Sequence, residues 1–312
     1  MILTLNLVHG PARLAALALA VGGCLVGLAG AAQFAARTDL VEIYVSVTDA
    51  SGRPLDGLAR EAFRVRDNGI DRPIAAFATG SLPLSMAVVI DHSFSMRGAR
   101  LAAARAGALA LLEALRADDR VDVLAMGSDV ETIAAADASR EAAREAVRRL
   151  TPWGTSPIVD AIRAATGAIH GRPGRRAIVL FTDGEDRDDE TTRRDALDAV
   201  RRSDALVYAV AVGSREPTLL DEFATASGGR VIRARDDRAA VEASAAIAAD
   251  LQHQYLLGIA PSEGPPGWHV LSVTVEVPRA MVRARQGYLV EARPAGASLE
   301  RPGASKSQGV WR

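Results

Sequence analysis

The sequence predicts an α/β fold, with a doubly wound, mostly parallel sheet flanked by helices and a small β module formed by the segments before and after it. From Leu84 to Gln252, short apolar strands alternate with Ala-rich helical stretches, which is typical of a parallel sheet covered by helices on both faces. Outside this region the pattern is β: residues 41–48 alternate at period two, and strand-like stretches resume after Gln252. Each flank has too few strands to be stable alone, so we expect the two flanks to pair with each other.

Composition narrows the functional classes. The chain has 312 residues, and its apolar fraction of 49% is enough for a sizeable core. Its 37 basic and 38 acidic residues nearly cancel, so bulk charge gives no reason to expect nucleic-acid binding. Cys24 is the only cysteine and lies in the N-terminal segment, which excludes a disulfide, a thiolate nucleophile or a cysteine zinc site in the rest of the chain.

The N-terminal segment has the character of an export signal. An uncharged stretch runs from Leu14 to Ala36 and leaves three alternatives open. Ala29–Ala31 offers the small-residue cleavage site of a signal peptide, whereas the uncleaved stretch is long enough to span a bilayer. Third, Val21–Cys24 resembles a bacterial lipobox, which would make Cys24 a lipid anchor. Each alternative places the remaining chain outside the cytoplasm, on the periplasmic or extracellular face, with membrane contact only through this segment.

The elements follow in order from these patterns. Before the α/β region we expect strands at 41–48, 63–65 and 74–77, with turns at 49–52 and 67–69. Within the α/β region we expect strands at 86–90, 121–126, 177–181 and 206–212, an antiparallel edge strand at 130–133, and helices near 98–116, 139–150, 156–170, 191–202, 217–226 and 237–252. After it we expect strands at 255–259, 269–277 and 281–285.

These elements imply five segments. They are an export segment (1–37), an N-terminal β segment (38–83), the α/β domain (84–252), a C-terminal β segment that pairs with the first (253–291), and a tail (292–312). The tail is rich in Pro, Gly, Ala and Ser, and we expect it to be disordered.

Oxygen-bearing residues gather where the predicted strands end. Asp91, Ser93 and Ser95 directly follow the apolar strand 86–90, and Asp183 follows the strand 177–181. A third loop, with Thr155 close to the start of a helix, lies between them in the sequence. Ligands of open α/β sheets bind beyond the carboxyl ends of the strands. Carboxylate and hydroxyl oxygens at this edge suit a hard divalent cation such as Mg²⁺.

Taken together, these three loops resemble the metal-ion-dependent adhesion site of von Willebrand factor type A domains, a Rossmann-like family. The resemblance implies a Mg²⁺ (or Mn²⁺) ion that the serines and the threonine reach and the two aspartates bind directly or through water. By position in the motif, the implied set is Asp91, Ser93, Ser95, Thr155 and Asp183. It further implies a protein partner whose Asp or Glu carboxylate completes the coordination. The flanks resemble those of a bacterial, von Willebrand factor A-related subgroup, notably at 45–49, 63–69, 255–259 and 282–288.

Two further side chains lie in these loops, and one rival function uses the same aspartate. His92 is interpreted as a loop residue beside the metal that contacts the partner, with a ligand or base as alternatives, and Trp153 as a recognition residue or a packing aromatic. The rival is a metal-dependent, phosphatase-like hydrolase using Asp91. Such enzymes need a second aspartate where Ser93 stands and a lysine, whereas the only lysine here is Lys306 in the tail. We therefore expect a metal-dependent binding (adhesion or scaffold) module of the cell envelope and not an enzyme.

Overall fold

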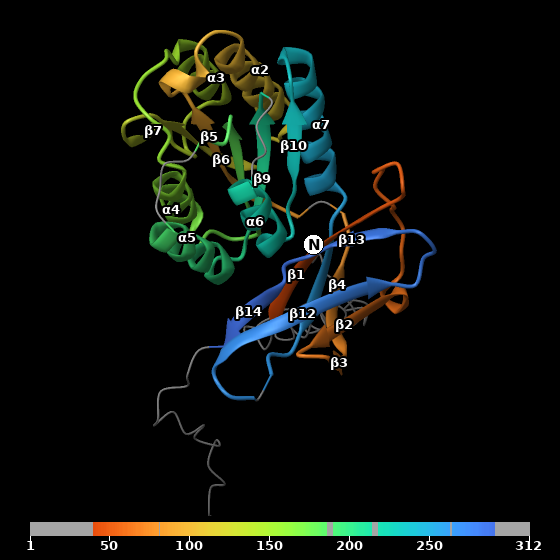
Figure 1. The fold of residues 1–312 in the computed structure, drawn as a ribbon. Helices are drawn as coiled ribbons and strands as arrows, with labels where there is room; N and C mark the ends of the chain where they lie inside the picture. Colours follow the sequence, from red (N-terminus) through yellow and green to blue (C-terminus); the bar gives the residue numbers. More distant parts are fainter. Residues whose placement is uncertain (1–39, 81, 186–189, 214–217, 263, 291–312) are drawn as a thin grey trace, which may run out of the picture. The chain divides into compact units, whose positions relative to one another are not determined.

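A six-stranded sheet forms the centre of the α/β domain, with helices on both faces (Figure 1). The computed structural model describes residues 40–80, 82–185, 190–213, 218–262 and 264–290. The predicted export segment and tail lie outside this described part. Within it, no helix combines the length and the apolar character that crossing a bilayer requires. The strands are β5 (Leu84–Asp91), β6 (Arg120–Met126), β7 (Val130–Ala134), β8 (Arg175–Thr182), β9 (Ala205–Val212) and β10 (Val231–Ala234).

The sheet order is β10-β9-β8-β5-β6-β7, and every pair is parallel except β6 with β7. The predicted fold class is therefore confirmed. From β5 the chain first moves to one side through β6 and β7, and then returns to the other side through β8, β9 and β10. The order reverses between β5 and β8, and in such sheets the reversal opens a crevice beyond the carboxyl ends of the strands. Strand β10 was not expected, because its four residues form a short edge strand with little apolar pattern.

The helices divide between the two faces of the sheet. They are α2 (Ala99–Ala114), α3 (Arg140–Arg149), α4 (Ile158–Ile169), α5 (Glu190–Arg202), α6 (Thr218–Ser227) and α7 (Asp237–Gln252). Two of them begin at side-chain caps: Ser139 Oγ accepts from Ala142 N at 3.1 Å, and an Asp236 oxygen accepts from Ala239 N at 2.8 Å. Such caps satisfy amide groups that the helix leaves without partners, which explains the starts of α3 and α7.

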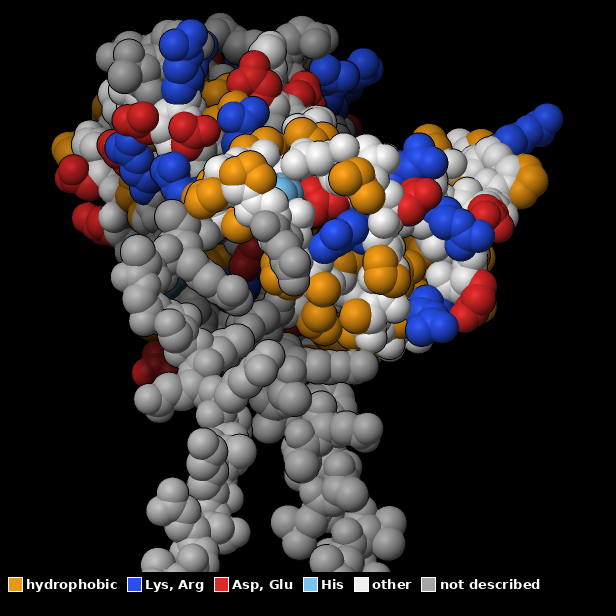
Figure 2. All heavy atoms as spheres, turned by 90° about the horizontal axis from the view of Figure 1, so that it is seen from below, with side chains coloured by type: hydrophobic (Ala, Val, Ile, Leu, Met, Phe, Trp, Pro, Cys, Tyr) orange, Lys and Arg blue, Asp and Glu red, His pale blue; other side chains and the backbone are white. Residues whose placement is uncertain are grey.

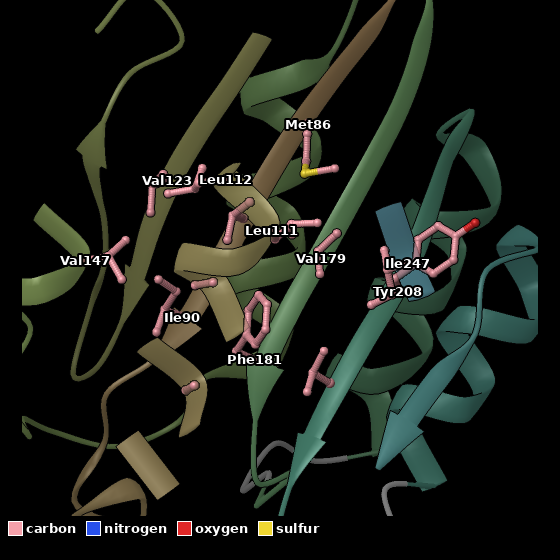
Figure 3. Close-up of a cluster of buried hydrophobic side chains, with 14 of the residues drawn as sticks. Met86, Ile90, Leu111, Leu112, Val123, Val147, Val179, Phe181, Tyr208 and Ile247 are labelled. Carbon is pink, nitrogen blue, oxygen red and sulfur yellow. The ribbon is translucent and has the colours of Figure 1, made fainter. Parts of the chain in front are cut away.

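Alternate residues of the central strands point into two separate hydrophobic cores, one on each face of the sheet. Met86 and Ile90 of β5, with Phe181 of β8, point into a cluster that α2, α3 and α7 cover, as Figure 3 shows. Val89 and Leu180 point to the opposite face, where α4, α5 and α6 pack. Because both faces are buried, the central residues of β5 and β8 are apolar without interruption.

The two flanking segments build one β module of two four-stranded sheets. One sheet has the order β13-β1-β11-β4, and the other β14-β12-β2-β3. Each sheet contains strands from before and after the α/β domain, which pair directly: Val45 pairs with Tyr255, and Val65 pairs with Val273. The strands are β1 (Val41–Thr48), β2 (Phe63–Asp67), β3 (Ile70–Arg72), β4 (Ile74–Ala78), β11 (Tyr255–Ile259), β12 (Gly267–Val275), β13 (Met281–Arg283) and β14 (Gly287–Val290).

The sheets of the β module share a core that includes Ile43, Phe63, Tyr255 and Leu271. The module is therefore a β structure contributed jointly by both flanks, as the sequence predicted. Strands β3 and β14 were not expected, since both are only three or four residues long.

Buried polar contacts join the β module to the α/β domain within one compact unit that begins at Val41. Gln254 Nε2 donates to Ser46 Oγ in β1 and to the Tyr208 hydroxyl in β9, at 3.2 Å in each case. Arg283 of β13 pairs with Asp250 of α7. The Asp250 carboxylate and the Gln254 side chain are both buried. Buried hydrogen bonds and ion pairs favour a specific arrangement, so these contacts help to fix how α7 continues into β11.

The β module also carries exposed apolar side chains, among them Ile70, Trp268, Val270, Met281 and Leu289. Figure 2 shows the molecule of Figure 1 from below. On this face, hydrophobic side chains are interspersed with Arg, Asp and Glu. Scattered apolar residues of this kind are ordinary on protein surfaces.

Candidate metal centre

Asp91 ends β5 and is completely buried. Its Oδ1 accepts a hydrogen bond from the backbone of Ser93 at 2.9 Å. Its Oδ2 accepts from two hydroxyls, Thr182 Oγ1 at 2.7 Å and Ser156 Oγ at 3.1 Å. Burial raises the pKa of the Asp91 carboxyl above its usual range, against the lowering effect of the Ser93 and Thr182 hydrogen bonds. None of the partners described for this carboxylate carries a positive charge.

Three serine hydroxyls converge beside this carboxylate. Ser93 Oγ lies 3.0 Å from Ser95 Oγ and 2.9 Å from Ser156 Oγ. Ser93 and Ser156 are buried, and Ser95 is half-buried. The sequence predicted Ser93 and Ser95 here; in the structure Ser93 contacts Asp91, and Ser95 joins the cluster through Ser93.

The third loop differs from the prediction. Thr155 is exposed, and its hydroxyl takes no part in the hydrogen-bonded cluster, whereas the buried Ser156 does. The reason lies in the backbone: Gly154 has φ of +77°, so the loop reverses there and the second hydroxyl after it faces Asp91. Thr155 and Ser156 are adjacent and both carry a hydroxyl, so the spacing of the motif could not distinguish between them. The hydroxyl that this loop contributes to the cluster is therefore that of Ser156.

Asp183 follows β8 and is nearly buried. Its Oδ1 accepts from the backbone of Glu185 at 3.1 Å. Its Oδ2 accepts from Arg100 Nη1 at 2.9 Å, and the same nitrogen donates to the carbonyl of Ser95 at 3.0 Å. Arg100, which belongs to no motif of the sequence, thus supplies a positive charge to the second carboxylate and links it to the serine loop.

His92 is held between neighbouring loops. Its Nδ1 lies 2.7 Å from the carbonyl oxygen of Thr151, and its Nε2 packs so close to Gly127 that a Cβ there would lie 2.7 Å away. Both ring nitrogens therefore face the backbone of neighbouring loops, and His92 helps to hold these loops in place. Trp153, by contrast, is exposed.

The donor set fits a hard cation. It consists of serine hydroxyls, one buried carboxylate without a charged partner, and a second carboxylate beside it, all oxygen atoms at one end of the sheet. Among the described residues, no group of three or more His, Cys, Asp or Glu side chains gathers as a metal site. The hydroxyl and carboxylate oxygens of the cluster are ligands that hard divalent cations prefer.

Comparison with known proteins agrees with this reading of the fold. Residues 86–185 match the family model of the von Willebrand factor type A domain. Over 116 residues the chain is 32% identical to the uncharacterized protein sll0103 of Synechocystis sp., a match that covers 36% of this chain and 28% of that protein's length.

Several solved structures are also similar to this chain. A von Willebrand factor type A protein from Catenulispora acidiphila has a TM-score of 0.50 and 16% identity, covering 78% of this chain and 72% of that one. The conserved hypothetical protein BatB from Bacteroides thetaiotaomicron has a TM-score of 0.46 and 21% identity, covering 54% and 98%. Proximal thread matrix protein 1 from the mussel byssus, solved with a zinc-occupied adhesion-site motif, has a TM-score of 0.49 and 13% identity, covering 61% and 50%.

The sheet order, the loops that meet at its carboxyl edge and the matched family model agree: within its α/β unit, residues 86–185 of this chain match the von Willebrand factor type A domain family.

Proposed function

We propose that this chain is a metal-dependent protein-binding module of the cell envelope. Domains of this family generally mediate protein interactions. In the proposal, Asp91, Ser93, Ser95 and Ser156 hold Mg²⁺ (or Mn²⁺), and Asp183 contributes from the second strand. A carboxylate of an Asp or Glu on the partner completes the coordination. The N-terminal segment exports the chain and, where retained, anchors it.

One observation carries the metal component: the buried Asp91 carboxylate, whose described partners are neutral, stands among converging hydroxyls. A buried carboxylate without a counter-charge is costly, and a divalent cation bound there removes that cost. When bound, the ion supplies an electrophilic position for an incoming carboxylate. The chain's own residues orient the hydroxyls and keep the ion at the crevice beyond β5 and β8.

We infer that the module is not an enzyme. Its nearest imidazole, His92, has both ring nitrogens against loop backbone, and the second carboxylate of the centre is paired with Arg100. Neither group is poised to abstract a proton from a water molecule. No feature of the site favours the phosphatase alternative.

The sharpest test compares the two adjacent hydroxyls. Ser156→Ala is expected to weaken binding of Mg²⁺ and Mn²⁺ by about tenfold or more, because it removes an oxygen that lies within the cluster. Thr155→Ala, the matched control, is expected to change affinity by less than about twofold, since its hydroxyl is outside. Isothermal titration calorimetry on the full chain, with thermal melting in chelator to verify folding, gives the measurement. Equal losses in both variants, or in neither, contradict the proposed ligand set.

Arg100 gives an independent test, with the opposite sign. Its guanidinium holds one oxygen of Asp183 and repels a dication at the centre. Arg100→Gln is therefore expected to tighten Mg²⁺ binding by about tenfold, a figure reduced for the partial exposure of the arginine. Arg163→Gln removes the same charge from a pair on helix α4 and serves as the control. If Arg100→Gln binds Mg²⁺ with unchanged or lower affinity, the cation does not lie close to Asp183.

A further inference from the structure

Two exposed aromatic side chains border the candidate metal centre. Phe94 directly follows Ser93, and Trp153 precedes Ser156 by three residues; their side chains are 49% and 61% exposed. Among the described residues of the α/β domain, the one other exposed large apolar side chain is Val241, at 40%. Neither aromatic belongs to a core cluster of the described structure, so the fold gains little from them. Large apolar residues kept in solvent at the mouth of a site point to an interaction surface.

The two rings are held in place before any partner arrives. Phe94 N donates to the carbonyl of Gly154 at 3.0 Å, and Trp153 N donates to the carbonyl of His92 at 2.6 Å. These bonds join the two loops that carry the hydroxyls. The rings meet edge to face, with centroids 6.2 Å apart and planes at 63°. A rigid aromatic pair loses little conformational freedom on binding, which favours it as an anchor for a partner.

Positive charge accompanies the aromatic pair. The Arg97 guanidinium lies over the Phe94 ring, 5.0 Å from its centroid, and its Nε donates to the Phe94 carbonyl at 3.2 Å. Within the described part of the chain Arg97 has no carboxylate partner. Arg100, which donates to the Ser95 carbonyl, is 43% exposed. The surface around the centre therefore offers aromatic rings and guanidinium groups together, which complements a partner that is both apolar and acidic.

We propose that Phe94, Trp153 and Arg97 form a docking surface for an acidic loop of a partner protein, in which a large apolar side chain stands next to the carboxylate that binds the metal. This inference rests on the function proposed above. Phe94 is the chain neighbour of Ser93, and successive Cα atoms lie about 3.8 Å apart. An extended peptide advances about 3.3 Å per residue, so a residue one or two positions from the bound carboxylate reaches the rings. Arg97 then receives a second acidic group of the same loop.

A peptide array tests this surface. The probes are synthetic peptides of the form Gly-Gly-Xaa-Asp-Yaa-Gly-Gly, with every amino acid at Xaa and Yaa and a matching set with Asn in place of Asp. The full chain is applied in MgCl₂ and in chelator. We expect Phe, Trp, Leu and Ile beside Asp to bind at least about fivefold more protein than Gly, only with Mg²⁺ and only in the Asp set.

The combined Phe94→Ser and Trp153→Ser variant is expected to lose this apolar preference while its Mg²⁺ affinity, measured by calorimetry, stays unchanged. Ile70→Ser is the matched control, since Ile70 is an exposed apolar residue of the β module. If the wild-type chain binds Mg²⁺ but its array shows equal signals, or none, for apolar and Gly flanks, the docking surface is wrong and the metal site stands. The same conclusion follows if the double variant keeps the preference. If the wild-type chain binds no Mg²⁺ at all, the proposed function itself fails.

Discussion

Asp91→Asn is expected to lower the affinity for Mg²⁺ by about a hundredfold or more, so that calorimetry detects no binding at millimolar metal. The carboxylate is fully buried, stands among the hydroxyls of Ser93, Ser156 and Thr182, and has no positively charged partner among the described residues. An amide of the same shape keeps the volume but removes the negative charge that a dication requires. Asp160→Asn, at an exposed aspartate in the first turn of α4, is the control and should bind metal normally.

The same variant separates metal binding from folding. In chelator, wild-type protein carries a buried charge that its surroundings do not neutralise, and the pKa of Asp91 is raised accordingly. Asp91→Asn removes that charge, and the Ser156 and Thr182 hydroxyls rotate to accept from the new amide. We therefore expect the variant to melt no lower than wild type in chelator. Mg²⁺ at a hundred times its dissociation constant should stabilise wild type by about 2.7 kcal/mol and leave the variant unchanged. A variant that melts well below wild type in chelator shows instead that Asp91 is structural.

Gly154→Ala is expected to produce the second large effect, destabilising the protein by about 2–4 kcal/mol and weakening Mg²⁺ binding. Gly154 has φ of +77°, and a Cβ there would lie 2.1 Å from the backbone nitrogen of Ser128, far inside van der Waals contact. Either the loop with Ser156 or the loop with Ser128 has to move, and both border the site. Chemical denaturation in chelator measures the first effect, and calorimetry measures the second.

Gly167→Ala provides the contrast. Gly167 lies in helix α4 and a Cβ there meets nothing within 4 Å, so alanine should stabilise the protein by about 0.5–1 kcal/mol and leave metal binding unchanged. If Gly154→Ala is as stable as wild type, then the loop is not held in the observed conformation.

Structural features that leave a pattern along the chain could be predicted from the sequence, and features that leave none could not. The apolar strands and the helices between them were predictable because burial on both faces leaves a continuous apolar pattern, and α7 begins and ends as expected at Asp237 and Gln252. Short edge strands such as β10 and β14 were missed, because four residues hold too little pattern to distinguish them from loops.

The candidate site shows the same division. Asp91, Ser93 and Ser95 were predictable because one strand and one turn fix their relative positions. The choice between Thr155 and Ser156 depends on a single positive φ at Gly154, which spacing does not encode. The Arg100–Asp183 pair joins residues from different elements, so it appears only when the sheet brings β8 beside β5. Exposure of Phe94 likewise depends on packing that no local pattern shows.

The β module has a consequence for the order in which the chain assembles. Strands β1 to β4 are synthesised first, yet partners such as Tyr255 and Val273 follow only after the whole α/β domain. Closing a loop of that length costs conformational entropy while the intervening chain is unfolded. Leu84 and Gln252 line one small cavity, so a folded α/β domain brings its two ends together and acts as a short connection. We therefore expect the flanks to meet last. Until they do, β2 and β3 can pair with each other, but β1 and β4 lack their partner strands, and this stage is the one most exposed to aggregation.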